Sequence, residues 1–142
     1  DAFGLMGSEN NMIQAYKRPV SSMSPIIVSK DGKPFLVTGT PGGSKIISAN
    51  MQMVLNVIEY GMNIGDASVA PRIHHQWHPD ELMIESGISP DTVTLLRQKG
   101  HKISFTKSSA SMGSLQTVMR KDGLFYGYSD PRRPGAKAVG VQ

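Results

Sequence analysis

Residues 18–48 read RPVSSMSPIIVSKDGKPFLVTGTPGGSKIIS and contain the pattern around which the chain is organised. Two short apolar runs, 25–28 and 34–37, flank a Lys-Asp-Gly-Lys turn at 30–33. Asp-Gly between apolar runs predicts a β-hairpin, because glycine tolerates the positive φ that tight turns demand. The second run is followed by TGTPGGS at 38–44, which opens directly into a stretch with helical apolar periodicity. The sequence therefore predicts a hairpin, a glycine-rich turn and a helix in immediate succession.

Two pairs of small residues in this stretch suit the binding of an anion. Ser21 and Ser22 can hold a carboxylate by charge-assisted hydrogen bonds; the alternative is a strand entry in which both hydroxyls bond local backbone. Gly42 and Gly43 lie between a strand end and a helix start, where backbone N–H groups are free. They can form an oxyanion hole, or simply supply the φ values that the turn needs. Spacing alone leaves both alternatives open for each pair.

Composition limits the classes of protein to which the chain can belong. Its 142 residues fit a single domain, 1–142, with one core. The absence of cysteine excludes disulfides, thiol catalysis and thiolate metal sites. No apolar run approaches the roughly 20 residues that span a bilayer. The net charge of +4 is scattered without a basic stripe, so we expect no nucleic-acid partner and instead a body that attracts anionic substrates. The chain does not begin with Met, and we expect a processed or trimmed piece.

The helix after the glycine pair carries apolar residues at i, i+4, i+7, i+8 and i+11, with Ser44 as its expected N-cap. We predict that these residues form its buried face, widened by Met53 and Val57: Ile47, Met51, Val54, Leu55 and Ile58.

The remainder of the chain mixes short strands and helices. Residues 1–17 have no clear period and predict a loop. Asp66 is an expected cap of a short second helix, residues 73–79 are expected to be irregular, and 82–84 to be a strand. Ser89 followed by proline predicts a third helix start.

From residue 101 the period falls to two. It predicts a strand and then a second Asp-Gly hairpin, before an irregular surface tail at 130–142. Five or six strands with three helices predict an α+β fold.

Two further clusters have competing interpretations. His74, His75 and His78 invite a metal site, but Trp77 and Pro79 interrupt any regular ligand spacing. An aromatic corner with histidines bonded to backbone is the favoured interpretation. The sequence DPRR at 130–133 can place a cation near an anionic site, but a solvated or chain-pairing loop is favoured.

The chain resembles the small subunit of γ-glutamyltranspeptidase over nearly its whole length. The motifs that carry the resemblance occur in order along the chain: RPVSSMSP at 18–25, KDGKPFLVTGTPGGS at 30–44, NIGDASVAPRIHHQWHPDEL at 63–82, ISPDTVTLLRQKGHK at 88–102, MGS at 112–114 and DGLFYGYSDPRRPGA at 122–136. The resemblance implies an N-terminal-nucleophile hydrolase with an αββα sandwich, in which antiparallel-dominated sheets pack against helices. The segment would be the C-terminal three-quarters of that subunit, with the first strands and the nucleophile outside it.

The resemblance also assigns roles to particular residues. It implies that Ser21 and Ser22 bind the α-carboxylate of a γ-glutamyl group, and that Gly42 and Gly43 supply the oxyanion-hole amides. Phe3 lies where many bacterial members have a tyrosine in a loop that covers the pocket, so 1–17 is the expected lid region. Phenylalanine keeps the packing there and loses the hydroxyl.

The implied activity is cleavage of the γ-glutamyl bond of glutathione or related compounds through a γ-glutamyl-threonine ester, with transfer to water or to an amino-acid or peptide acceptor. The nucleophilic threonine is absent from this chain. No metal and no cofactor are expected, because the α-amine of the threonine serves as the general base. The implied partner is the large subunit of the same precursor, in a heterodimer, and the implied location is periplasmic or secreted. The alternatives are a related cephalosporin (glutaryl) acylase of the same fold and a non-catalytic fragment.

Overall fold

The computed structural model describes residues 7–140. Within that range the helices are α1 (Lys45–Ile58), α2 (Ile64–Val69) and α3 (Pro90–Gln98), with short 3-10 turns at Glu9–Asn11 and Ser109–Met112. The strands are β1 (Ile26–Lys30), β2 (Lys33–Gly39), β3 (Ile73–His74), β4 (Leu82–Ile84), β5 (Ile103–Phe105), β6 (Gln116–Lys121) and β7 (Leu124–Ser129).

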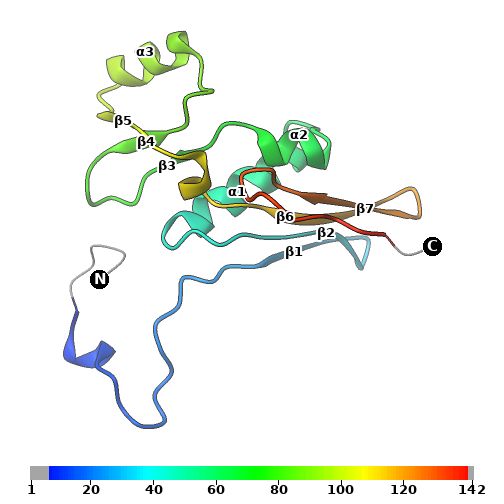
Figure 1. Cartoon of the computed structure of the whole chain (residues 1–142), viewed down its shortest axis with the longest axis horizontal. Coiled ribbons are helices and arrows are strands. Elements are labelled where there is room, and N and C mark those ends of the chain that lie inside the picture. The colour runs from blue at the N-terminus through cyan, green and yellow to red at the C-terminus, as the bar shows by residue number, and fades with distance from the viewer. Residues whose placement is uncertain (1–6, 141–142) are drawn as a thin grey trace.

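Four strands form an antiparallel sheet in the order β1-β2-β6-β7, built from two hairpins (Figure 1). Both hairpins turn at an Asp-Gly pair in which each residue has positive φ: 52° and 73° at Asp31 and Gly32, and 52° and 80° at Asp122 and Gly123. Two consecutive positive φ values are the signature of the tight turn that matches strand twist. Both hairpin predictions are confirmed.

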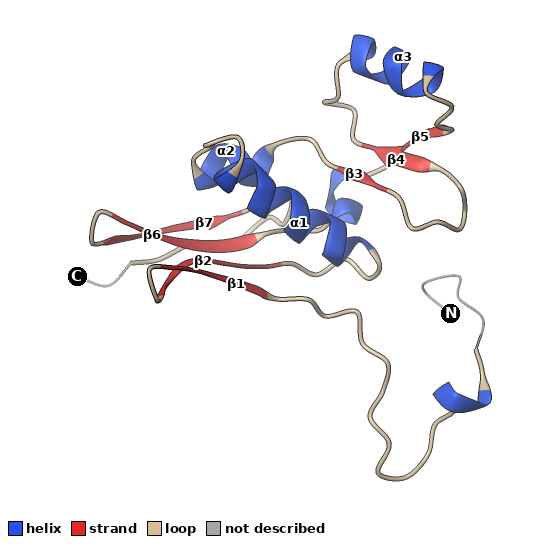
Figure 2. Cartoon of the chain, turned by 180° about the vertical axis from the view of Figure 1, so that it is seen from behind, coloured by secondary structure: helices blue, strands red, loops and turns tan. Residues whose placement is uncertain are grey.

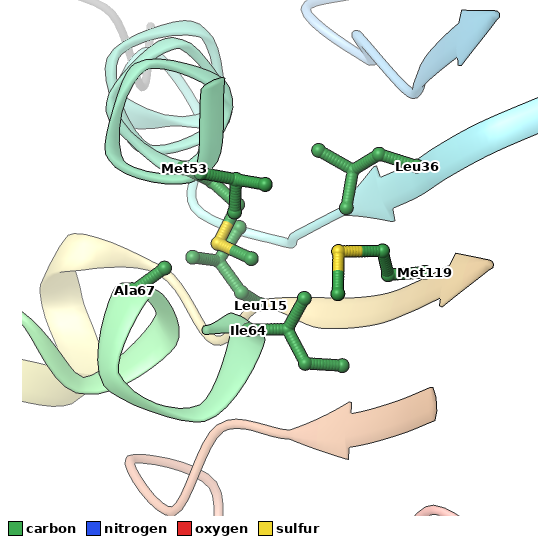
Figure 3. Packing of buried hydrophobic residues seen from close by; sticks show 7 residues of the cluster. Leu36, Met53, Ile64, Ala67, Leu115 and Met119 are labelled. Carbon is green, nitrogen blue, oxygen red and sulfur yellow. The ribbon is translucent and has the colours of Figure 1, made fainter. Parts of the chain in front are cut away.

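Helices α1 and α2 cover one face of this sheet (Figure 2). Leu36 on β2 lies opposite Met119 on β6, and both point into the core beneath the helices. They pack with Met53 of α1, Ile64 of α2 and Leu115 (Figure 3). Burial of this apolar surface fixes the register, because a slip by one residue would turn each strand's core side chains outward.

Met53 and Val57 are buried as predicted, but the rest of the buried face of α1 differs from the predicted one by a rotation of one residue. The residues that the helix buries are Ile46, Ala49, Asn50, Met53 and Val57. Four of the five residues predicted to be buried are instead exposed: Ile47, Met51, Leu55 and Ile58. Only Val54 of that set, which is partly buried, packs against the core. The helix is apolar on both sides, so periodicity could not tell which side faces this sheet.

A second, three-stranded sheet has the order β3-β4-β5 and carries α3 on its connection (Figure 1). Strands β4 and β5 are parallel, as expected of two strands joined through a helix. Ser89 caps α3 as predicted, accepting a hydrogen bond from the Thr92 N–H at 3.3 Å. Strand β3 lies inside the stretch predicted to be irregular. Helix α2 is capped by Asn63, which accepts from the N–H of Asp66, rather than by Asp66 itself.

Four charged residues join the two sheets. Arg72, next to β3, pairs with Asp130, next to β7, and Arg132 pairs with both Asp130 and Glu85. All four side chains are at least nine-tenths buried. The prediction of a solvated loop at 130–133 is therefore wrong for Asp130 and Arg132, because their partners lie far away in the sequence.

The α+β class is confirmed, and within residues 7–140 all but one of the strand pairs are antiparallel. Residues 7–20 extend away from the four-stranded sheet in both views (Figures 1 and 2). In the described range, no helix has the length and apolar character required to cross a membrane.

Candidate active-site elements

The serine pair lies in the extended segment that enters β1. Ser21 accepts a hydrogen bond from the N–H of Met23 at 3.1 Å. This is the local backbone bond of the alternative interpretation, yet it leaves the Ser21 O–H free to donate. Ser22 is partly buried and has no hydrogen-bond partner among the described residues. Both hydroxyls thus retain a donor for a ligand.

Asn50 anchors this segment to α1. Its side-chain Nδ2 donates to the carbonyl of Ser24 at 2.6 Å, and the residue is fully buried. Because Ser24 is two residues beyond Ser22, this bond holds the end of the serine segment against the helix. A buried polar side chain at this position of α1 was not expected from the apolar periodicity.

The glycine pair adopts a backbone that favours glycine, with φ of +148° at Gly42 and +60° at Gly43. Their carbonyls accept from the N–H groups of Lys45 and Ile46, each at 3.2 Å, and so begin the helix. Their own N–H groups have no acceptor in the described part of the chain. The turn therefore needs glycine for its conformation and also presents two free donors at the N-terminus of α1.

A close backbone contact supports the glycine pair from one side. Gly113 lies against the turn, and a Cβ added there would come within 2.6 Å of the Thr40 Oγ1. That hydroxyl accepts from the Ser114 N–H at 2.6 Å and donates to the Pro41 carbonyl at 2.7 Å. No role was predicted for Thr40 or Gly113 from the residue pattern. The signal was the Met-Gly-Ser motif at 112–114, in which Ser114 is bonded to Thr40, 74 residues away.

A cavity of about 390 Å³ brings the serine pair together with the start of α1. Its lining includes Ser21 and Ser22 on one side and Ser44, Ser48 and His74 on the other. Gly42 and Gly43 directly precede Ser44 in the chain, although they are not among the lining residues. A larger groove of about 1160 Å³ lies elsewhere, between the α1–α2 connection and the β6–β7 hairpin.

Ser44 does not cap α1 as predicted, since its side chain makes no hydrogen bond to the first turn. Instead its hydroxyl donates to the Oε1 of Gln76 at 2.6 Å. The same oxygen lies 2.9 Å from Nε2 of His74, whose Nδ1 lies 2.8 Å from the Ser48 hydroxyl.

His75, which also lines this cavity, is bonded to residues close to it in the sequence. His75 Nε2 lies 3.2 Å from an Asp80 oxygen, and its Nδ1 accepts from the Trp77 N–H at 3.1 Å. His74 bonds side chains rather than backbone, so the predicted backbone pattern is wrong for that residue. Across residues 7–140, no three His, Cys, Asp or Glu side chains gather where a metal could bind. Phe3 lies outside the described residues.

The described part of the chain thus has free amides at the start of α1 and a hydroxyl pair that shares a cavity with the first turn of that helix. The fold is that of the N-terminal-nucleophile hydrolases, as its structural relatives show. The model of the gamma-glutamyltranspeptidase family matches residues 1–140, and the chain belongs to this family.

Individual relatives support the same family assignment. The glutathione hydrolase proenzyme of Escherichia coli is 54% identical over 133 residues, 93% of this chain and 22% of the relative. The crystal structure of the Helicobacter pylori gamma-glutamyltranspeptidase T380A mutant superposes with a TM-score of 0.85 at 46% identity, covering 94% of this chain and 73% of that one. Cephalosporin acylase from Bacillus halodurans superposes with a TM-score of 0.76 at 27% identity, covering 83% of this chain and 22% of that one. The chain spans about a fifth of the length of the E. coli relative.

Proposed function

We propose that this chain works as part of a γ-glutamyltranspeptidase that cleaves the γ-glutamyl amide bond of glutathione and related compounds. The observation that carries the proposal is the cavity shared by the Ser21-Ser22 pair and the start of α1, in a chain of this family. A γ-glutamyl group has a carboxylate at one end and the scissile carbonyl at the other. The cavity supports binding of the carboxylate end through the Ser21 and Ser22 hydroxyls on one side, and its other side is lined by Ser44, directly after the Gly42 and Gly43 amides proposed for the carbonyl end.

In this mechanism the two serine hydroxyls hold the α-carboxylate of the substrate. A threonine outside this chain attacks the γ-carbonyl carbon, and the carbonyl oxygen of the substrate becomes negatively charged. The N–H groups of Gly42 and Gly43 donate to that oxygen, and loss of one such donor typically costs about a hundredfold or more in rate. The amine leaves, and a γ-glutamyl-threonine ester remains. Water or the amine of an amino acid or peptide then attacks the ester, and the same amides stabilise the second oxyanion. The threonine's own α-amine moves the protons.

The expected partner is the large subunit of the same precursor. One face of the four-stranded sheet supports this: Ile27, Val37 and Val118 pair across three neighbouring strands and are exposed, on the side opposite α1 and α2. A second apolar sheet packed there would complete an αββα sandwich. We further propose that the chain is a single domain of the small subunit, that residues 1–17 with Phe3 form a lid, and that the enzyme is periplasmic or secreted.

The experiment compares two chromogenic substrates on the assembled two-subunit enzyme. γ-Glutamyl-p-nitroanilide carries both the carboxylate and the amino group, whereas glutaryl-p-nitroanilide keeps the carboxylate and lacks the amino group. We expect turnover of the first and little of the second. The reverse preference would support the related acylase, and turnover of neither would support the non-catalytic fragment; either result would overturn the proposal.

A further inference from the structure

The glycine pair needs support from outside, because glycine restricts its own backbone less than any other residue. Both glycines are exposed, and neither has a side chain to pack. On the β2 side the turn is held by Thr40 and Gly113, as described above. On the helix side the next side chain along the chain is that of Ser44. What holds Ser44 therefore determines how the Gly42 and Gly43 amides are aimed.

A hydrogen-bonded pair of side chains holds α1 at two successive turns. Ser44 and Ser48 are four residues apart, so their hydroxyls project from the same side of the helix. The Ser44 hydroxyl donates to Gln76 Oε1 at 2.6 Å, and the Ser48 hydroxyl lies 2.8 Å from His74 Nδ1. Gln76 and His74 are themselves 2.9 Å apart through Oε1 and Nε2. Hydrogen bonds from Ser44 and Ser48 thus tie the start of α1 to β3 and to the loop that follows β3.

The orientation of the Gln76 amide follows from its contacts. Its Nε2 donates to the carbonyl of His78 at 3.0 Å, which leaves Oε1 facing Ser44 and His74. Because Oε1 can only accept, the hydrogen on His74 must be on Nε2 in this contact. Gln76 Oε1 therefore accepts hydrogen bonds from the Ser44 hydroxyl and from His74 Nε2. Removal of this oxygen would leave both donors without that acceptor. His74 is buried, so its unpaired N–H would be costly.

We propose that Gln76, supported by His74, is a positioning residue that aims the Gly42 and Gly43 amides at the oxyanion by fixing Ser44. The proposal rests on the proposed function, since it concerns the transition state of that reaction. Gln76 lines the same cavity, but its side-chain oxygen is bonded to Ser44 and His74 and its side-chain nitrogen to the His78 carbonyl. Its effect therefore comes through the peptide that joins Gly43 to Ser44. An oxyanion hole acts mainly in the transition state, so displaced amides lower kcat more than they raise KM.

The test replaces Gln76 by leucine in the assembled enzyme and measures steady-state hydrolysis of γ-glutamyl-p-nitroanilide. We expect kcat to fall tenfold to a hundredfold, while KM changes less than threefold. Gln52→Leu is the matched control. Gln52 also joins α1 to β3, donating to the Ile73 carbonyl at 2.8 Å and accepting from the Ile73 N–H at 3.0 Å, but two turns further along the helix. An equal fall of kcat in both variants would indicate general loosening of α1 and overturn the proposal.

Substitutions at Ser44 provide a second, smaller change in case Gln76→Leu does not assemble. Ser44→Ala should lower kcat, and Ser44→Thr, which keeps the hydroxyl, should retain most of it. In the double variant Ser44→Ala/Gln76→Leu the two losses should not multiply, because both remove the same hydrogen bond. Multiplicative losses would mean that Ser44 acts directly on the substrate and would overturn the proposal. If the unmodified enzyme does not cleave the substrate at all, the proposed function fails first; full kcat in the Gln76 and Ser44 variants would remove only the positioning role.

Discussion

Arg132 binds both carboxylate oxygens of Glu85: its Nε donates to Oε1 at 2.9 Å, and its Nη2 donates to Oε2 at 2.7 Å. Glu85 follows β4 of the small sheet, and Arg132 lies just beyond β7 of the large one. The same Glu85 Oε2 also accepts the backbone N–H of Arg72 at 2.8 Å. This pair therefore fixes the small sheet, with its own apolar cluster, to the sheet that carries the candidate site.

Removal of the Arg132 side chain should destabilise the protein strongly. Arg132→Ala leaves Glu85 buried without its guanidinium, and breaking a buried pair in this way costs about 3–5 kcal/mol. The matched control is the neighbouring Arg133→Ala, since Arg133 is exposed and its side chain forms no ion pair among the described residues. That change should stay within about 0.5 kcal/mol of the unmodified protein. Urea unfolding of the assembled protein measures both, and equal stabilities of the two variants would contradict the role given to the Arg132–Glu85 pair.

Asp130 should make stability depend on acid pH. Burial alone raises the pKa of its carboxyl, but hydrogen bonds from the Arg132 N–H and the Arg72 guanidinium, with the charge of Arg72, bring the pKa below its ordinary value of 3.8. A lowered pKa in the folded state contributes stability that is complete at pH values above about 5 and is lost as pH falls through the folded pKa. Asp130→Asn should therefore be less stable at pH 7 and lose less stability on acidification. Unfolding free energies from pH 7 to pH 3 measure this, and parallel curves for the two proteins would show that Asp130 has no such role.

Substitution of Gly113 by alanine should be harmful for two reasons: the positive φ of this residue and the lack of space for a Cβ atom. Gly113 has φ of +90°, and Gly100, at the end of α3, has φ of +93°. A positive φ is strained for alanine at either position, at a cost of about 1–3 kcal/mol. Only at Gly113 does the new Cβ meet Thr40, whose hydroxyl cannot rotate without losing its bonds to Ser114 and Pro41.

We therefore expect Gly113→Ala to lower kcat by about tenfold to a hundredfold, because a displacement of about 1 Å at a catalytic group has effects of that size. Gly100→Ala should keep kcat, since no atom lies within 4 Å of its added Cβ. Steady-state kinetics on γ-glutamyl-p-nitroanilide compare the two. Normal kcat in Gly113→Ala would mean that this contact does not aim the glycine pair.

The parts of the fold that sequence predicted well are local. The two Asp-Gly turns and the cap at Ser89 depend on residues within four positions of each other, so the sequence alone predicts these elements. The strand entry at 25–28 and the helix after the glycine pair follow from the same local rules. For these elements tertiary structure only confirms what neighbouring residues already prefer.

The parts that could not be predicted depend on contacts between distant residues. Arg132 and Glu85 are 47 residues apart, and nothing near either one indicates the pair. The buried face of α1 was misjudged because Ile46 and Ile47 are equally apolar, and only packing against β2 and β6 selects one of them. Ser44 looked like a cap because serine usually is one, but Gln76, 32 residues away, accepts its hydroxyl instead. Distant partners of this kind determine most of the geometry around the cavity.

The most direct test of the central claim is a comparison of two substrates on the Ser21→Ala/Ser22→Ala variant of the assembled enzyme. The substrates are γ-glutamyl-p-nitroanilide and 4-aminobutyryl-p-nitroanilide, which has the same chain and amino group without the α-carboxylate. Each hydrogen bond to a charged group is worth about 1.5–3 kcal/mol, so the variant should lose about a hundredfold or more in kcat/KM on the first substrate. On the second it should match the unmodified enzyme within a few-fold. An equal loss on both substrates would contradict the assignment of the serine pair to the α-carboxylate.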